Sequence, residues 1–459
     1  MHDLKNYTKK RRFLSFSCFF TRKKASRNTF KYHSQKKPDQ RRLRYILPVL
    51  AVLLALYPFS FVVTSLKPKI MGVFNSWTTF AQASSPEIDA YQSFHVASPF
   101  LNNADLSGEQ LIVPLDGAGS IRFTIDPDLQ QEVHETMRSK DVPYGVFVAI
   151  EPKTGKILAL TGYSSVDPAW GRSPYYNLYP MASLFKIITA AAALEQNKVG
   201  PDTLFEYRGS SYSENPKYWN INPGRSNQSM PLSLALGKSI NPVFGRLASD
   251  YVGAESIMTY AHRFGFNQVL FPGTGVTPSK AAVPQDDRQL KLMGAGLGRE
   301  VKISPLHAAV IMAAIANHGT MMTPLLAEEI RDKDNKVLYS LQSRSIRKLV
   351  TTETAEQLTR MLLTTVTKGT SRKAFHDRRG RPLLDSVTVA AKTGSINGTD
   401  PSGHYSWFAA FAPVNDPQIA LVALIINQDK WKIKASYLGE KALEQFFLAK
   451  ETKSQESGI

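Results

Sequence analysis

The feature that most constrains this chain is an apolar run at residues 184–194, which contains one lysine and directly follows a serine. Pro180 precedes the run and Gly200 follows it, so the pattern predicts a buried helix. Ser183 would lie in the first turn and Lys186 one turn later on the same face. A serine hydroxyl becomes an effective nucleophile when a base takes its proton, and a lysine can be that base once burial lowers its pKa. The run therefore predicts a lysine-activated serine, with helix N–H groups available to an oxyanion.

The serine–lysine spacing alone does not identify a site. It recurs at Ser34 and Lys37 and at Ser345 and Lys348, both times among polar and charged residues. A surface serine near a lysine is the ordinary interpretation of such a match. Only the copy at Ser183 opens an apolar helix, so the context selects it.

The positive charge of the chain is concentrated in its first 44 residues. The formal net charge is +18, of which residues 1–44 contribute +13 and the remaining 415 residues only +5. A nucleic-acid-binding face would need its basic residues in the folded part. The sequence therefore predicts a basic cytoplasmic tail that directs topology or is attracted to anionic lipids, and no nucleic-acid partner.

Residues 45–66 follow this tail without a single charged side chain. As a helix they would span about 33 Å, enough to cross the hydrocarbon core of a bilayer. Basic residues stay on the cytoplasmic side, so we expect a single-pass signal anchor in the cytoplasmic (inner) membrane, with the N-terminus inside and the rest periplasmic or extracellular. The alternative is a cleaved signal peptide. The length of the run argues against it, as does the distance to the first Ala-x-Ala, at residues 81–83.

The rest of the chain divides into three predicted parts. Residues 67–120 lack sustained periodicity and are interpreted as an extracytoplasmic linker with one strand at residues 111–114. Residues 121–450 are interpreted as a folded domain and residues 451–459 as a polar tail. The single cysteine, Cys18, lies in the cytoplasmic tail. The exported part therefore has no disulfide and no cysteine metal site, and must be stabilised by its core.

Within the folded domain, strand patterns occur at both ends and helical patterns in the middle. Strands are predicted at residues 145–150, 157–160, 386–393, 405–412 and 418–426, and helices at 232–236, 254–264, 305–316, 352–367 and 438–448. This order predicts an α/β domain of the α+β type, whose sheet combines early and late strands.

Two further motifs follow the serine helix at long range. Ser239-Ile240-Asn241 begins 56 residues after Ser183, and Lys392-Thr393-Gly394-Ser395 begins 153 residues after Ser239. Each has a second copy, Ser395-Ile396-Asn397 and Lys153-Thr154-Gly155 respectively, and the latter is placed at the tip of a predicted hairpin. The Lys392 copy instead ends a predicted strand and is followed by a small residue.

The order Ser-x-x-Lys, Ser-x-Asn, Lys-Thr-Gly resembles the signature of the penicilloyl-serine transferases, which comprise penicillin-binding proteins and serine β-lactamases. The flanking segments resemble the family too, over about residues 121–450. They are Thr124-Ile125-Asp126, Phe264-Gly265-Phe266, Gly294-Ala295-Gly296, Ala316-Asn317-His318-Gly319 and Trp407-Phe408-Ala409-Ala410-Phe411. The resemblance implies a five-stranded antiparallel sheet with flanking helices and an all-helical subdomain, preceded here by a single transmembrane helix, with the active site between sheet and subdomain.

The resemblance also implies catalytic roles. Ser183 would attack the carbonyl of the penultimate D-alanine of a peptidoglycan stem peptide, and Lys186 would accept its proton. Ser239 would relay a proton to the leaving group, and Asn241 would hold the substrate amide. No metal or organic cofactor is implied. One departure is that the Pro-Gly frequent before the family's serine is Met181-Ala182 here.

Four more residues are implied to bind the substrate. Lys392 and Thr393 would face its terminal carboxylate. Gly394 would let the strand edge approach the ligand. The backbone N–H groups of Ser183 and Ser395 would form the oxyanion hole.

The function implied is that of a membrane-anchored D,D-transpeptidase that cross-links stem peptides through an acyl-enzyme and is covalently inhibited by β-lactams. A D,D-carboxypeptidase shares every motif and stays open. A serine β-lactamase and a non-catalytic sensor of wall peptides or β-lactams are the further alternatives. A cell-wall synthesis complex is a possible partner, although the 55 or so residues between membrane and domain leave no room for the pedestal of many family members.

Overall fold

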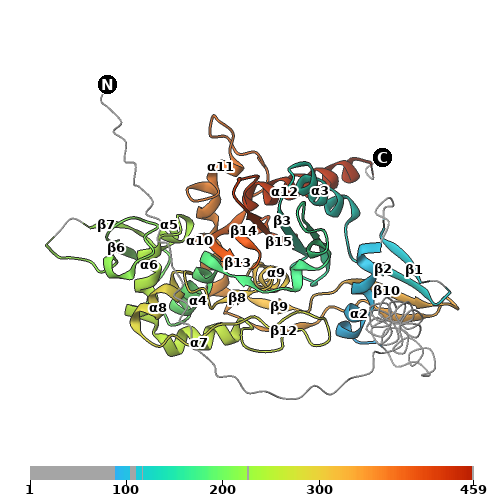
Figure 1. Ribbon diagram of the computed structural model, residues 1–459, viewed down its shortest axis with the longest axis horizontal. Coiled ribbons are helices and arrows are strands. Elements are labelled where there is room, and N and C mark those ends of the chain that lie inside the picture. Colours follow the sequence, from blue (N-terminus) through green and yellow to red (C-terminus); the bar gives the residue numbers. More distant parts are fainter. Residues whose placement is uncertain (1–87, 104–109, 116, 225–226, 457–459) are drawn as a thin grey trace, which may run out of the picture. The chain divides into compact units, whose positions relative to one another are not determined.

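The computed structural model describes residues 88–103, 110–115, 117–224 and 227–456 (Figure 1). The predicted basic tail and membrane segment lie outside these residues, so both stay predictions. Within the described residues, no helix is both long enough and apolar enough to cross a bilayer.

A five-stranded antiparallel sheet forms the centre of the domain, as predicted. Its order is β13 (Ala390–Thr399), β14 (Ser402–Ala412), β15 (Ile419–Asn427), β3 (Tyr144–Ile150) and β4 (Ile157–Tyr163). From β13 to β3 the strands are paired in continuous register, with Lys392 opposite Ala409 and Phe408 opposite Ala423, and the register shifts only between β3 and β4, at Ala149 and Ile150. Figure 1 shows the strands side by side, with β13 nearest to the helices α4 and α10.

The edge strand β13 begins and ends later in the sequence than the apolar pattern predicts. The expected strand covered residues 386–393, whereas β13 starts at Ala390 and continues to Thr399. Backbone pairing with β14 continues as far as Thr399 and Ser402, and this pairing needs no apolar side chains. The polar half of the strand was therefore not visible as an apolar pattern.

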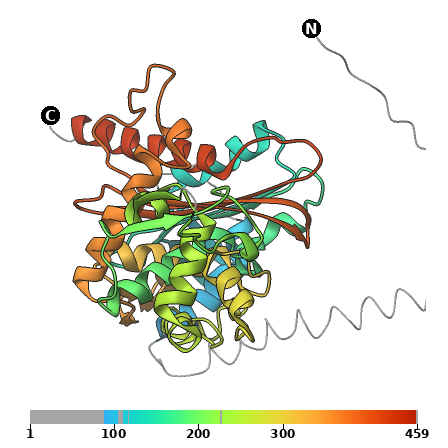
Figure 2. The same ribbon diagram turned by 90° about the vertical axis from the view of Figure 1, so that its left-hand side faces the viewer.

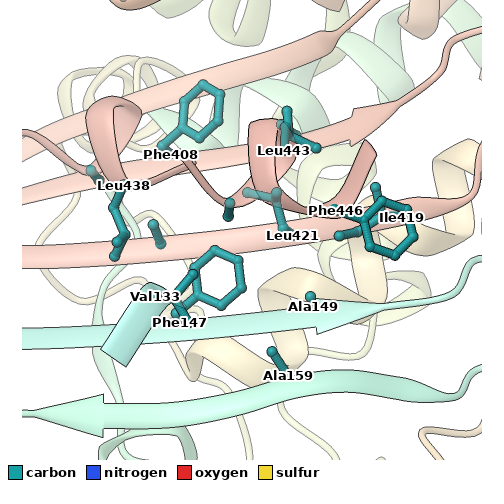
Figure 3. Close-up of a cluster of buried hydrophobic side chains, with 14 of the residues drawn as sticks. Val133, Phe147, Ala149, Ala159, Phe408, Ile419, Leu421, Leu438, Leu443 and Phe446 are labelled. Atoms are coloured by element: carbon teal, nitrogen blue, oxygen red, sulfur yellow. The ribbon is translucent and has the colours of Figure 1, made fainter. Parts of the chain in front are cut away.

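Helices cover both faces of the sheet. On one face lie α12 (Ala435–Glu456) and α3 (Pro127–Ser139), which enclose a core that includes Phe147, Phe408 and Leu443 (Figure 3). On the other face lies α9 (Pro305–Ala316), buried over its entire surface. Figure 2 shows the red C-terminal helix on one side of the strands and the green and yellow helices on the other. α12 also continues into the segment predicted as a polar tail.

The middle of the chain is mostly helical. Its helices are α4 (Lys186–Glu195), α5 (Leu232–Gly237), α6 (Asn241–Arg246), the π-helix η6 (Leu247–Val252), α7 (Ala254–Arg263), α8 (Asp287–Gly294), α10 (Thr352–Thr367) and α11 (Arg372–Phe375). The segment before α5, for which no helix or strand is predicted, contains a hairpin, β6 (Leu204–Tyr207) with β7 (Gln228–Pro231). Another small pair joins β5 (Tyr179–Pro180) to β8 (Lys302–Ile303).

The segment predicted as a linker contains regular structure in its described part. After α2 (Ala90–Ala97) come β1 (Ile112–Leu115) and β2 (Gly119–Phe123), which join β10 (Ala327–Asp332) and β11 (Val337–Ser340) in a four-stranded antiparallel sheet. A two-stranded sheet of β9 (Thr320–Met322) and β12 (Ser345–Lys348) completes this part. β1 lies one residue later than the strand predicted at residues 111–114. The β1–β2 hairpin gains its stability from a third strand far away in the sequence, β10, which pairs with β2 and which local periodicity does not show.

Candidate active site

The predicted nucleophile lies on a turn that precedes a buried helix. Residues Ala182–Phe185 form the 3-10 helix η4, and the α-helix proper begins at Lys186. Ala182 takes a left-handed backbone conformation (φ +54°) immediately before Ser183. The indole Nε1 of Trp407 on β14 donates to the Pro180 carbonyl at 2.9 Å and ties this turn to the sheet. Ser183 is half-buried there.

Lys186 makes three contacts through its amine. Its Nζ lies 2.8 Å from Ser183 Oγ, 2.8 Å from Asn241 Oδ1 and 2.5 Å from the Ala295 carbonyl oxygen. The Ala295 carbonyl oxygen and Asn241 Oδ1 can only accept hydrogen bonds. The Ser183 hydroxyl can accept a hydrogen bond and can also donate one. A neutral amine therefore fits with its two N–H bonds toward Asn241 and Ala295 and its lone pair toward Ser183.

The surroundings favour that neutral form. Lys186 is completely buried, and burial lowers its pKa well below the usual 10.5, with the positive charge of Lys392 lowering it further. In the part of the chain that the structure describes, neither lysine forms an ion pair. A buried amine without a counter-ion is stabilised by losing its proton.

The Ser239 motif forms the turn between α5 and α6. Ser239 is in the left-handed region (φ +58°), which reverses the chain after α5. Asn241 is the first residue of α6, and its Nδ2 donates to the Ser213 carbonyl at 3.3 Å. That bond leaves Oδ1 of the same amide directed at Lys186.

Lys392 joins the third motif to the second. Its Nζ donates to Ser239 Oγ at 2.9 Å and to the Thr393 carbonyl at 2.8 Å. The side chain is fully buried, and this burial lowers the pKa of Lys392 to about 7. Ser239 Oγ thus accepts from a lysine and keeps its own proton available for another acceptor.

The remaining residues of the third motif differ in exposure. The Thr393 hydroxyl lies 2.5 Å from that of Thr370. Gly394 packs against the Ser183 turn, because a Cβ there would be 3.2 Å from both the Ala182 and the Trp407 Cβ atoms. Ser395 is exposed on β13, the edge strand of the sheet. The structure therefore brings all eight predicted site residues to the junction of η4, the Ser239 turn and β13.

Sequence reasoning missed two contributions to this arrangement. Thr370 lies in the turn after α10, where its N–H donates to the Gly237 carbonyl at 3.0 Å, so it links the Ser239 turn to Thr393. Ala295 contributes only a backbone oxygen. The Gly294-Ala295-Gly296 segment was recognised as a flank, but no sequence signal assigns a role to a backbone carbonyl or to one threonine in a polar turn.

The second Ser-x-Asn copy, Ser395-Ile396-Asn397, lies on β13 and begins at a predicted site residue, whereas the other described second copies lie on other elements. Lys153, Thr154 and Gly155 are in the turn between β3 and β4, where Lys153 pairs with Asp416. Ser345 and Lys348 are on β12. No cluster of three or more His, Cys, Asp or Glu side chains suited to a metal ion occurs among the described residues.

The chain is similar to known proteins over most of this domain. Residues 145–447 match the family described as penicillin binding protein transpeptidase domain. The chain is 30% identical over 380 residues to the peptidoglycan D,D-transpeptidase PbpA of Mycobacterium tuberculosis, covering 72% of this chain and 73% of that protein. It is 27% identical over 348 residues to stage V sporulation protein D of Bacillus subtilis, covering 68% and 50% respectively.

The fold is also similar to solved structures. Penicillin-binding protein A from M. tuberculosis, as its ceftriaxone acyl-enzyme complex, superimposes with a TM-score of 0.60 at 26% identity, covering 71% of this chain and 79% of that one. Its penicillin G acyl-enzyme complex gives a TM-score of 0.57, also at 26% identity. The similar protein forms acyl-enzymes with ceftriaxone and penicillin G. In the present chain, the same fold carries a buried lysine in contact with a half-buried serine.

Proposed function

Because this chain belongs to the penicillin-binding protein transpeptidase domain family, we propose that it is a peptidoglycan D,D-transpeptidase that works through an acyl-enzyme on Ser183. The observation that carries this proposal is the contact of a buried, counter-ion-free Lys186 with the Ser183 hydroxyl at 2.8 Å. A base with a lowered pKa within hydrogen-bond reach is what the serine needs.

In the acylation step, Ser183 Oγ bonds to the carbonyl carbon of the penultimate D-alanine while its proton moves to Lys186. The carbon–nitrogen bond to the terminal D-alanine then breaks, and Ser239 passes its proton to the leaving amine and regains one from Lys186, so the Ser183 proton departs with the terminal D-alanine and Lys186 becomes neutral again. Ser239 suits this relay because Lys392 donates to its oxygen and leaves its hydroxyl proton free. The backbone N–H groups of Ser183 and Ser395 bind the oxyanion. An amine of a second stem peptide reverses these steps and forms the cross-link.

Substrate binding relies on the other wall of the site. Lys392 and Thr393 bind the terminal carboxylate, and Asn241 holds the substrate amide with the part of its side chain not engaged by Lys186. A bound carboxylate supplies the counter-ion that Lys392 lacks, so ligand binding stabilises its charged form. β-Lactams carry a carboxylate next to a reactive carbonyl and acylate the same serine.

The test follows the intact mass of the full-length protein in detergent during incubation with benzylpenicillin. We expect one persistent adduct that is absent in Ser183→Ala and present in the matched control Ser345→Ala, whose serine is on β12. Rapid loss of the adduct with continuing antibiotic hydrolysis would make the protein a β-lactamase. No adduct at all would overturn the catalytic assignment and favour a sensor.

A second measurement separates cross-linking from trimming. A D-Ala-D-Ala stem peptide is supplied with and without a peptide acceptor amine, and the products are separated by chromatography. A D,D-transpeptidase gives the dimer when the acceptor is present, whereas a D,D-carboxypeptidase gives the shortened peptide in both reactions.

The location of the enzyme is part of the same proposal. Residues 45–66 anchor the chain in the cytoplasmic membrane, with the basic tail inside and the catalytic domain outside, where it can join a cell-wall synthesis complex. The support is the uncharged 22-residue run next to a +13 tail. Membrane fractionation tests it: the full chain should sediment with membranes, and release by high salt would contradict an anchor.

A further inference from the structure

A strongly basic segment follows the C-terminal end of α10. Residues 368–385 contain six lysine and arginine side chains and two aspartates, a net charge of +4 in 18 residues. Residues 45–459 together carry only +5, so most of the net charge outside the basic tail is concentrated in this one segment. Figure 1 and Figure 2 show the orange loop after α11 standing out from the rest of the domain.

The loop is a hairpin that its own hydrogen bonds hold in shape. The Asp377 N–H donates to the Arg381 carbonyl at 2.9 Å. The Asp377 carboxylate accepts from the backbone N–H groups of Arg379 at 2.8 Å and Arg381 at 2.9 Å. At the base of the hairpin, Phe375 is buried and its ring lies 5.6 Å from that of Phe408 on β14. The central sheet and the turn therefore fix the position of the exposed tip.

Five cations of this segment have no carboxylate partner. Arg381 pairs with Asp377 at 2.7 Å, whereas none of the other five forms an ion pair within 4.0 Å in the part of the chain that the structure describes. All five are exposed, and together they are called the basic ridge: Lys368, Arg372, Lys373, Arg378 and Arg379. The guanidinium of Arg372 lies 3.2 Å from where a Cβ on Gly380 would be, so α11 and the hairpin tip form one surface. Like charges held close together repel one another, and an anionic ligand relieves that repulsion.

The basic ridge adjoins the proposed active site. Thr370 lies between Lys368 and Arg372 in the sequence, and its hydroxyl contacts that of Thr393. Two residues of extended chain span about 7 Å. The cations of the ridge therefore begin directly beside the residue that is expected to face the terminal carboxylate of the substrate.

The ligand that fits this arrangement is anionic and reaches both the ridge and the site. A stem peptide in the site uses its terminal carboxylate at Lys392 and Thr393. The uncross-linked peptidoglycan strand that carries it presents further carboxylates on neighbouring stem peptides, and arginine forks match carboxylates well. One exposed ion pair contributes little, but several on one polymer add up, because the first contact keeps the others nearby.

We propose that the basic ridge is an interaction surface for the peptidoglycan strand, where it binds carboxylates of stem peptides next to the one in the active site. The ridge therefore favours a polymeric substrate over a single stem peptide. This inference rests on the proposed function, because it assumes that the reacting stem peptide lies at Ser183.

The experiment compares a polymer with a monomer. Full-length protein in detergent reacts with a fluorescent penicillin in the presence of either uncross-linked peptidoglycan strands or a single stem peptide that ends in D-Ala-D-Ala. The inhibition constants are expressed per stem peptide, and their ratio is the polymer advantage. We expect an advantage at low salt that shrinks as salt is added, because exposed charges are screened. The basic tail is present in every variant, so its contribution is common to all the ratios.

Paired variants assign the advantage to the ridge. Arg378→Gln combined with Arg379→Gln should reduce the polymer advantage by roughly fivefold at low salt, without changing the inhibition constant of the single stem peptide. Arg378→Lys combined with Arg379→Lys keeps both charges and should restore most of the advantage. The matched control, Lys333→Gln combined with Lys336→Gln, removes the same charge from the exposed turn between β10 and β11 and should leave the advantage unchanged.

The outcomes separate this inference from the proposed function. No competition by the strands, or an unchanged advantage in the Arg378 and Arg379 double Gln variant, would overturn it and leave the ridge to another partner, such as an anionic lipid surface. An equal loss in the Lys333 and Lys336 control would show a general effect of charge and overturn it as well. Failure of penicillin to acylate the wild type would instead contradict the proposed function. The penicillin rate of each variant corrects for a general loss of fold.

Discussion

Two buried lysines, Lys186 and Lys392, occupy one site without a carboxylate partner among the described ion pairs. Burial lowers the pKa of both amines, and the charge of Lys392 further disfavours a charge on Lys186. Their proposed roles need opposite protonation states. Lys186 must be neutral to accept the Ser183 proton, and Lys392 must be charged to bind a carboxylate.

The first prediction concerns pH. The neutral fraction of Lys186 rises with pH through its lowered pKa, whereas the charged fraction of Lys392 falls as pH rises through about 7. The second-order rate of acylation by benzylpenicillin should therefore be bell-shaped over about pH 5 to about pH 10, reporting the free enzyme. Lys392→Arg keeps its charge, so the alkaline decrease should move to higher pH. An unchanged alkaline limb in that variant would assign the decrease to another group.

The second prediction concerns Thr370, a positioning residue that acts through Thr393. Its hydroxyl lies 2.5 Å from the Thr393 hydroxyl and 3.4 Å from the Gly237 carbonyl oxygen, so this hydrogen bond orients the Thr393 hydroxyl beside the Ser239 turn. Thr370→Val removes one hydrogen bond, so acylation should slow by about tenfold, mainly through weaker binding. Thr370→Ser should restore most of the rate. Thr367→Val, at the exposed end of α10, is the control. Equal rates for the Ser and Val variants would contradict the role of the hydroxyl.

At the scale of elements, the site depends on close backbone contact between the loop after α8 and η4. Gly296 has φ +71°, and a Cβ there would lie 2.3 Å from the Ala182 carbonyl oxygen and 2.7 Å from Ser183 Cα. Both contacts are with backbone, which cannot rotate away. The loop also carries the Ala295 carbonyl to Lys186, so this one approach sets both the nucleophile and its base.

The third prediction follows from this contact. Gly296→Ala should displace the Ser183 turn and slow acylation by roughly 100-fold, because an ångström-scale misplacement of a catalytic group has effects of that size. Gly298→Ala is the matched control two residues away, where a Cβ would meet its nearest neighbour at 3.4 Å, an ordinary contact. Acylation kinetics and thermal unfolding are measured for both. Equal behaviour of the two variants would contradict the close contact at Gly296.

At the scale of the whole molecule, the sheet separates the main core from the site. Phe408 on β14 packs under α12, whereas its neighbour Trp407 faces the Ser183 turn. The stability of the domain and the geometry of its site are therefore supported on opposite faces. Substitutions in the core under α12 should therefore change the stability of the domain without changing the geometry of the site.

The fourth prediction uses this separation. Leu443 on α12 is fully buried, so Leu443→Ala should destabilise the protein by about 2–5 kcal/mol. Leu448, on the same helix, is 54% exposed, and Leu448→Ala should have a much smaller effect. Denaturant unfolding gives the stabilities. The acylation rate of the folded Leu443→Ala protein at room temperature should stay at the wild-type value, and a slower rate would show that the two faces are coupled.

The sequence by itself determined the parts of this protein that local patterns encode. The apolar run after Ser183 specified a buried helix and a desolvated lysine, and the apolar strands at both ends specified the central sheet. Three short motifs, read together, pointed to the correct family. These conclusions hold because side-chain type and spacing along one segment fix what that segment can bury.

Only the tertiary structure decided what depends on segments far apart in the chain. The contacts of Lys186 with the Ala295 carbonyl and of Thr370 with Thr393 join residues 109 and 23 positions apart. The polar end of β13 is a strand because β14 pairs with it, and the β1–β2 hairpin is part of a larger sheet because β10 pairs with β2. A hollow lined by Tyr179, Lys302 and Asp400, among others, likewise combines residues from segments far apart in the sequence. Backbone hydrogen bonds and charge contacts across space leave no periodic trace in the sequence, which is why they had to be seen in the fold.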